Sequence, residues 1–398
     1  MKKERKTAAS EKSLKIACYR KPFYIKPYRE PKIWGVGGIG EYWYGAEDAD
    51  KSSMTVLGND TCSLREIVSY NPESFLGEKV VTRFGKQLPL VKILTPKSRL
   101  SVQFHDSKNE LWIITEIDRR VAGKSPWIIM GFSQESADLY GKNVIKHYKQ
   151  SLISYGDALN NLINFMINCG NRDLLDTKKD VMLAAIEAVQ SRPGSKETAK
   201  TLDKLTIARK SLDMFYNRQY IEIGDVVPIP CRTLHALGPG IQVIEPQISG
   251  PTQSLEDGAN YPIRYAFPAY PRKEAKRILD IDRAEEMNFN VMEKIFPELI
   301  QKTDHVAIER LPGGFEDRGL EVHRIRLKKG VELQQTLTSF HYLAVTQGLA
   351  NVVINDEKYE IPRALPGGEM LLVPKSVKNY IIMATETAQI IDTFTPIE

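Results

Sequence analysis

The chain has 398 residues, which is enough for two or three domains with a substantial buried core. Apolar residues make up 42% and charged residues 26%, and no stretch approaches the roughly 20 consecutive apolar residues of a transmembrane helix. The net charge of +5 is small for this length, and no dense basic stripe with interleaved aromatics occurs. The sequence therefore predicts neither a membrane nor a nucleic-acid partner.

Composition also indicates the compartment. The basic first fifteen residues are followed by no apolar run, so they do not form a secretory signal. The four cysteines are widely separated and show no CxxC pairing, which favours free thiols in a reducing environment. We expect a cytoplasmic protein.

The first elements are read from caps and spacing. A glycine cluster at residues 35–40 lies among aromatic residues and is typical of close backbone packing rather than of a dinucleotide loop. Ser63 and Glu66 have the spacing of a capping box. The patterns that follow predict helices over 63–71 and 73–84 and strands over 88–93 and 100–105.

The segment 101–112 carries the first chemical signal. Gln103 and His105 are two residues apart on a predicted strand, so their side chains leave the same face. The turn formers at 106–109 predict a tight hairpin, in which His105 lies directly opposite Glu110. An imidazole, a carboxylate and an amide oxygen at one spot suit a borderline divalent ion such as zinc, which needs a further ligand.

The pattern changes after residue 132. Long segments with helical periodicity run over about 133–216 and include predicted helices at 158–167 and 178–189. Short strands resume at 221, a further helical pattern runs over 273–286, and strands fill the chain from 320 onward. This predicts a catalytic domain over 1–132 and 217–300, a helical insertion over 133–216 and a C-terminal domain over 301–398.

The fourth ligand is found by a resemblance. Gly224, Pro230 and His235 have the Gly-x5-Pro spacing with a later His of the second motif of the cupin superfamily, although Arg232 stands where that pattern usually has Gly. The segment 103–110 resembles the first cupin motif, with Gln in place of its first His. Together the two motifs imply a metal-holding β-barrel.

The other histidines have no such setting. A lone His on a strand is more often structural than a metal ligand, and we assign structural roles to His147, His305, His323 and His341. In the C-terminal part, a second Gly-x5-Pro pattern at 368–374 has Asn379 at the His position. It resembles a cupin barrel that has lost its metal.

Three blocks make the resemblance specific: residues 39–46, 63–105 and 224–245 are similar to the type I phosphomannose isomerase family. The resemblance implies a mainly β fold with an α insertion, built of two cupin-like β-barrels (jelly rolls), the second metal-free. It also implies that Gln103, His105, Glu110 and His235 bind Zn²⁺, the set already reached from the residues and the cupin motifs.

The same resemblance implies catalytic residues. Lys108 occupies the place of a family lysine two residues before the metal-binding Glu, and a solvated turn lysine is the equally weighted alternative. Glu245 resembles a family glutamate near the reacting carbons, and burial would raise its pKa. The family's Ser-Asp pair is absent after Glu245, and Arg264 is the residue that an insertion at 253–260 would bring into the place of the family Arg.

The function implied is an aldose–ketose isomerase that interconverts mannose 6-phosphate and fructose 6-phosphate through an enediol, with Glu245 or a zinc-bound water moving the proton. A different sugar phosphate, a sugar-sensing cupin without turnover, and an iron cupin dioxygenase are the alternatives. The partner expected is a small phosphorylated sugar, and the sequence predicts no oligomeric state.

Overall fold

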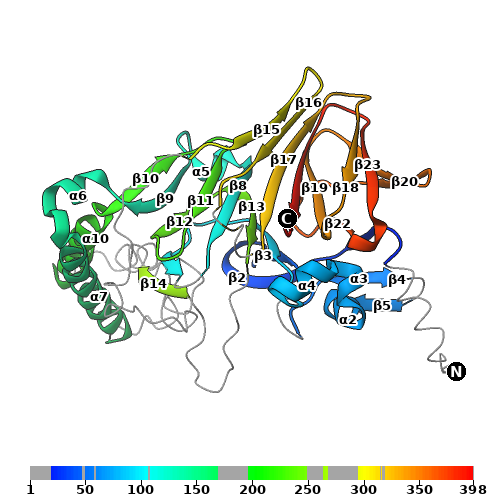
Figure 1. Ribbon diagram of the computed structural model, residues 1–398. Helices are drawn as coiled ribbons and strands as arrows, with labels where there is room; N and C mark the ends of the chain where they lie inside the picture. Colours follow the sequence, from blue (N-terminus) through cyan, green and yellow to red (C-terminus); the bar gives the residue numbers. More distant parts are fainter. Residues whose placement is uncertain are drawn as a thin grey trace, which may run out of the picture.

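The computed structural model describes residues 19–46, 50–57, 60–105, 108–168, 196–248, 263–267, 295–313, 315 and 319–397. The described chain is mainly β, with helices gathered at one end of the molecule and near the N-terminal strands (Figure 1). No described helix is both long and apolar enough to cross a membrane.

Two sheets form the part of the molecule that carries the site. One has six antiparallel strands in the order β11-β8-β13-β6-β3-β2 and the other has five in the order β10-β9-β12-β7-β14. The strands of the first are β2 (Tyr28–Val36), β3 (Ile39–Tyr44), β6 (Leu90–Leu94), β8 (Glu110–Ile117), β11 (Val226–Ile229) and β13 (Ile241–Gln247). Those of the second are β7 (Val102–His105), β9 (Trp127–Phe132), β10 (Tyr216–Tyr220), β12 (His235–Leu237) and β14 (Ile263–Phe267).

Two further sheets are built mostly from the C-terminal part. Seven strands follow the order β1-β22-β19-β24-β17-β16-β15, and four follow the order β18-β23-β20-β21. The seven are β1 (Phe23–Ile25), β15 (Glu298–Lys302), β16 (Val306–Arg310), β17 (Glu321–Leu327), β19 (His341–Gln347), β22 (Met370–Val373) and β24 (Ala388–Phe394). The four are β18 (Glu332–Thr336), β20 (Ala350–Ile354), β21 (Glu357–Glu360) and β23 (Asn379–Ala384), and β4 (Met54–Leu57) and β5 (Asp60–Ser63) pair separately.

Successive side chains along a strand point to opposite faces of its sheet, and this alternation determines which sheets pack together. On the six-stranded sheet, Trp112 and Val243 belong to a core shared with the five-stranded sheet, whereas Ile113 and Ile244 belong to a core shared with the seven-stranded sheet. A third core lies between the seven-stranded and four-stranded sheets. The six-stranded sheet therefore contributes apolar side chains to a core on each of its faces, and one of these cores joins the two halves of the chain.

The helical segment packs beyond the five-stranded sheet. Helices α6 (Gln134–Tyr140), α7 (Val144–Asn168) and α10 (Lys196–Asp213) lie together at one end of the molecule (Figure 1). Their buried faces continue the core of that sheet. The predicted helix at 158–167 is part of α7, while the helices predicted at 178–189 and 273–286 and the insertion at 253–260 lie outside the described residues.

Two local predictions are confirmed. Ser63 and Glu66 form both hydrogen bonds of a capping box at α2 (Leu64–Tyr70), which is followed by α3 (Pro72–Leu76) and α4 (Glu78–Phe84). In the glycine cluster, a Cβ on Gly35 would lie 2.2 Å from the backbone nitrogen of Gly40, so the two strands of the hairpin approach too closely for any side chain there.

The predicted barrels are only partly matched. The described strands form stacked sheets and do not close into a barrel. β1 joins the seven-stranded sheet by pairing with β22, so a strand from the start of the chain belongs to a sheet of C-terminal strands. The domain boundaries stay predictions.

Candidate metal centre

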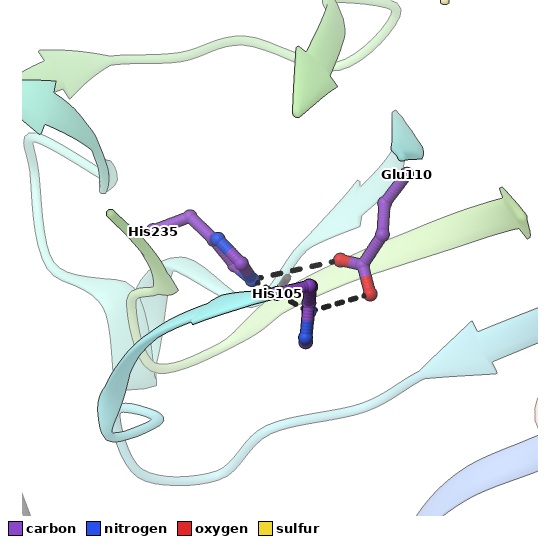
Figure 2. Close-up of side chains that lie close together, drawn as sticks. All are labelled: His105, Glu110 and His235. Atoms are coloured by element: carbon purple, nitrogen blue, oxygen red, sulfur yellow. Dashed lines mark hydrogen bonds and ion pairs between the residues drawn. The ribbon is translucent and has the colours of Figure 1, made fainter. Parts of the chain in front are cut away.

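Three of the four predicted ligands converge between the five-stranded and six-stranded sheets. His105 ends β7, His235 begins β12 and Glu110 begins β8, and their ligand atoms all lie within 4.8 Å of one another (Figure 2). All three side chains are buried. The neighbouring strands β7 and β12 place the two imidazoles side by side, and the facing sheet supplies the carboxylate.

The predicted hairpin between β7 and β8 is wrong. β7 pairs with β12 and β14, whereas β8 pairs with β11 and β13, so the short connection crosses from one sheet to the other. The carbonyl oxygen of His105 accepts a hydrogen bond from the backbone of Arg232 at 2.6 Å, which fixes the end of β7. His105 and Glu110 therefore meet across the gap between two sheets, and not as neighbours within one.

The contacts define a compact cluster. Nε2 of His105 lies 2.9 Å from Oε1 of Glu110, and Nε2 of His235 lies 3.7 Å from Oε2 of the same carboxylate. The two Nε2 atoms are 3.1 Å apart. Nδ1 of His235 is 2.8 Å from the carbonyl oxygen of Thr233, which can only accept, so this nitrogen carries the hydrogen and Nε2 presents its lone pair.

Electrostatics keep the cluster in its ligand form. Burial and the ammonium of Lys108 lower the pKa of His105 to about 3, although Glu110 opposes this. Burial also lowers the pKa of His235. For Glu110, burial favours the neutral acid, but Lys108 and the two imidazoles outweigh it and lower the pKa well below its usual range. Neutral imidazoles and an ionised carboxylate are the forms that bind metal ions.

The residues present fit a divalent cation. Nδ1 of His105 is buried and has no hydrogen-bond partner among the described residues. Among the described residues, the polar contacts of this ring are made by Nε2, which lies within the cluster. Two imidazoles and a carboxylate directed at one point, with a carbonyl oxygen holding the tautomer of His235, match the ligand types and the outer contacts of protein zinc sites.

The sequence also predicted Gln103, Lys108 and Arg264 as site residues. Gln103 is paired with His235 across β7 and β12, and strand alternation puts it on the face of His105. Lys108 is buried, and its Nζ lies 2.5 Å from Oε1 of Glu110, so it is not a solvated turn lysine. Arg264 lies in β14 opposite Phe104, and its side chain is outside the described part of the structure.

Glu245 lies on β13, on the face of the six-stranded sheet that carries Glu110. Its two carboxylate oxygens accept hydrogen bonds from Nζ of Lys92 at 3.2 Å and from the indole N–H of Trp112 at 3.0 Å. Burial and the negative charge of Glu110 raise the pKa of Glu245 to about 7, although Lys92 and Lys108 lower it. Burial therefore favours the neutral form of this carboxyl group more than that of an ordinary glutamate.

Sequence reasoning missed the network behind Glu245. Nζ of Lys92 also lies 3.7 Å from Oε2 of Glu41, which accepts a hydrogen bond from the indole N–H of Trp43 at 2.8 Å. Burial would raise the pKa of Glu41, but Lys32 and Lys92 lower it to about 2. The sequence feature that could have indicated this network is Lys92 itself, a charged residue within the otherwise apolar and fully buried strand β6.

The other described histidines stand apart from the cluster. His341 is buried and contacts both carboxylate oxygens of Asp392 at 2.9 Å, and His323 pairs with Glu321. Asn379, at the place of the missing cupin His, is exposed. Among the described residues, the only group of three or more His, Cys, Asp and Glu side chains arranged to bind a metal is that of His105, Glu110 and His235.

The part of the chain that holds His105 and Glu110 is similar to known proteins. Residues 25–122 match the family model described as "Phosphomannose isomerase type I, catalytic domain". A mannose-6-phosphate isomerase from Salmonella typhimurium is 37% identical over 70 residues, a segment that spans 18% of this chain and 18% of that relative's length.

The fold likeness extends much further. A variant of the Salmonella typhimurium phosphomannose isomerase matches with a TM-score of 0.62 at 15% identity, over 95% of this chain and 100% of the other. A structure of a mannose 6-phosphate isomerase described as holo and zinc-bound matches with a TM-score of 0.61 at 14% identity, over 94% and 100%. Residues 25–122 are therefore similar to the catalytic domain of type I phosphomannose isomerases, and the fold over nearly the whole chain is similar to that of the solved mannose 6-phosphate isomerases.

Proposed function

We propose that the protein is a zinc-dependent aldose–ketose isomerase that interconverts mannose 6-phosphate and fructose 6-phosphate. The observation that carries the proposal is the buried cluster of His105, Glu110 and His235 beside Glu245, a buried carboxyl group held by Lys92 and Trp112. The family's fold and its catalytic-domain match support the same reaction. In this proposal the two pairs of stacked sheets are cupin-like halves, of which the second holds no metal.

Gln103, His105, Glu110 and His235 would hold the cation. The imidazoles and the carboxylate supply three ligands, and the amide of Gln103 completes the set from the position paired with His235. A bound Zn²⁺ would supply Lewis-acid polarisation of the substrate. Burial of the cluster lowers the local dielectric constant, which would strengthen that polarisation.

Glu245 is the proposed proton carrier. Aldose–ketose isomerisation removes a proton from one carbon and returns it to the neighbouring carbon, so a single group serves as base and then as acid. A carboxyl group with a pKa of about 7 is suited to both roles near neutral pH. Lys92 and the indole of Trp112 fix its orientation through one hydrogen bond to each oxygen.

The substrate's charge needs basic partners. The ammonium of Lys108 lies within the site, beside the metal-binding carboxylate, where it would donate to a sugar or phosphate oxygen. Arg264 is the proposed partner for the phosphate because a guanidinium can bind two of its oxygens at once. A cytoplasmic location and a small sugar phosphate as the substrate belong to the same proposal.

Replacing Glu245 with Gln should lower kcat by roughly 10²–10⁴-fold, the usual contribution of a positioned acid–base group. The amide keeps the size of the side chain but cannot take up the substrate proton. Zinc content should remain that of the unmodified protein, because Glu245 is not a proposed ligand. A coupled fructose 6-phosphate assay with metal analysis checks both, and an unchanged kcat would remove Glu245 from the mechanism.

Zinc binding should persist to about pH 5. An imidazole with an ordinary pKa of about 6.5 would lose its metal to protons below that value. Here the pKa of His105 is about 3 and that of His235 is also lowered, so protons compete only at lower pH. Retained zinc after dialysis at each pH is the measurement. Loss of the metal between pH 7 and 6 would contradict this account of the two histidines.

The test of the function is a panel of aldose and ketose phosphates incubated with the zinc-loaded protein. Turnover of mannose 6-phosphate to fructose 6-phosphate is the expected result. Turnover of a different sugar phosphate alone would identify that compound as the substrate in place of mannose 6-phosphate. Sugar binding without turnover would indicate a sensor. Oxygen uptake with bound iron would indicate a dioxygenase, which the proposed amide ligand of Gln103 disfavours.

A further inference from the structure

The ammonium of Lys108 is a buried cation with two acceptors. Its Nζ lies 2.5 Å from Oε1 of Glu110 and donates a hydrogen bond to Oε1 of Gln247 at 2.8 Å. Lys108 and Gln247 are only 6% and 3% exposed. Gln247 ends β13 and pairs directly with Glu110 of β8, so one backbone register sets the lysine's two acceptors side by side.

This geometry creates a competition for Glu110. A divalent cation at the cluster needs the carboxylate that Lys108 already contacts. A buried ammonium that gives up part of a carboxylate needs another acceptor, because an unsatisfied buried charge is costly. Among the described residues the acceptor available is the amide oxygen of Gln247.

We propose that Gln247 is a positioning residue that holds Lys108 in place and thereby leaves Glu110 available to the divalent cation. The inference rests on the cation site of the proposed function but not on the reaction. Without the amide oxygen, the cation-free protein still pairs Lys108 with Glu110. In the cation-bound protein without that amide oxygen, the one acceptor left to Lys108 would be Glu110, which would also bind a doubly charged ion. Loss of Gln247 therefore destabilises the bound form more and weakens binding.

The experiment measures zinc affinity by competition with a chromogenic chelator. Gln247→Leu should bind zinc about tenfold more weakly, as is typical when an outer contact of a metal ligand is removed. In a Lys108→Met background the same Gln247→Leu change should have no effect, because it acts through the lysine. Gln242→Leu is the matched control: Gln242 is buried on the same strand, but its amide donates to Thr115 and to the carbonyl oxygen of Ala364.

Unchanged affinity in Gln247→Leu would overturn the inference, and so would an equal loss with and without Lys108. Should Gln247→Leu fail to fold, Gln247→Glu keeps the acceptor oxygen and should bind zinc at least as tightly as the unmodified protein, and weaker binding would overturn the inference. Absence of zinc binding by the unmodified protein would instead remove the proposed cation site, and the inference with it.

Discussion

Replacing His235 with Ala is expected to remove the bound zinc and to lower isomerisation by about a thousandfold or more. The imidazole is fully buried and its Nε2 faces both His105 and Glu110, so alanine leaves the cluster without one of its nitrogen ligands. A Lewis acid contributes several kcal/mol to stabilising the transition state, and each 1.36 kcal/mol is worth about a factor of ten in rate.

Metal analysis and the coupled fructose 6-phosphate assay check this result on the same preparation. His323→Ala is the matched control, because His323 contacts Glu321 on β17 and lies outside the cluster. It should retain zinc and turnover. A His235→Ala protein that folds and keeps its activity would rule out the site.

Replacing Lys92 with Met should lower the free energy of unfolding by about 3–5 kcal/mol, the usual cost of breaking a buried ion pair. Burial opposes the charge of Lys92, but the carboxylates of Glu245 and Glu41 raise its pKa and keep it ionised. Removal of the ammonium leaves two buried carboxyl groups without their shared partner. The pKa of Glu245 should then rise further, because Lys92 is one of the charges that lower it.

Urea unfolding monitored by circular dichroism measures the change. Lys26→Met is the control: Lys26 lies 3.9 Å from Glu369 with its side chain 64% exposed, and exposed pairs contribute at most about 1 kcal/mol. Equal stability of the two single lysine variants would contradict the ion-pair network.

Motif spacing predicted that His105, Glu110 and His235 lie close together, because strand alternation and turn positions follow local rules. Gln103 and His105 share a face through strand alternation, and the Gly224–His235 pattern fixes the second histidine relative to a turn. The turn also explains Arg232, which adopts a positive φ of 64°, the conformation that the glycine usual at this position would adopt without strain. Close sequence spacing was nevertheless a poor guide to pairing, since β7 and β8 belong to different sheets.

The surroundings of the cluster could not be predicted in the same way. Lys92 meets Glu245 across 153 positions of sequence, and Lys108 meets Gln247 across 139. Both contacts depend on the order of strands β6, β13 and β8 within the sheet, which no local pattern encodes. An isolated charge in an apolar strand signals that a partner exists, but only the strand order identifies it.

The most direct test of the account is zinc titration of metal-free protein with mannose 6-phosphate turnover measured at each step. We predict that activity rises in proportion to bound zinc and saturates at about one zinc per chain, as a single site of four protein ligands requires. Full turnover by protein that contains no divalent metal would contradict the account.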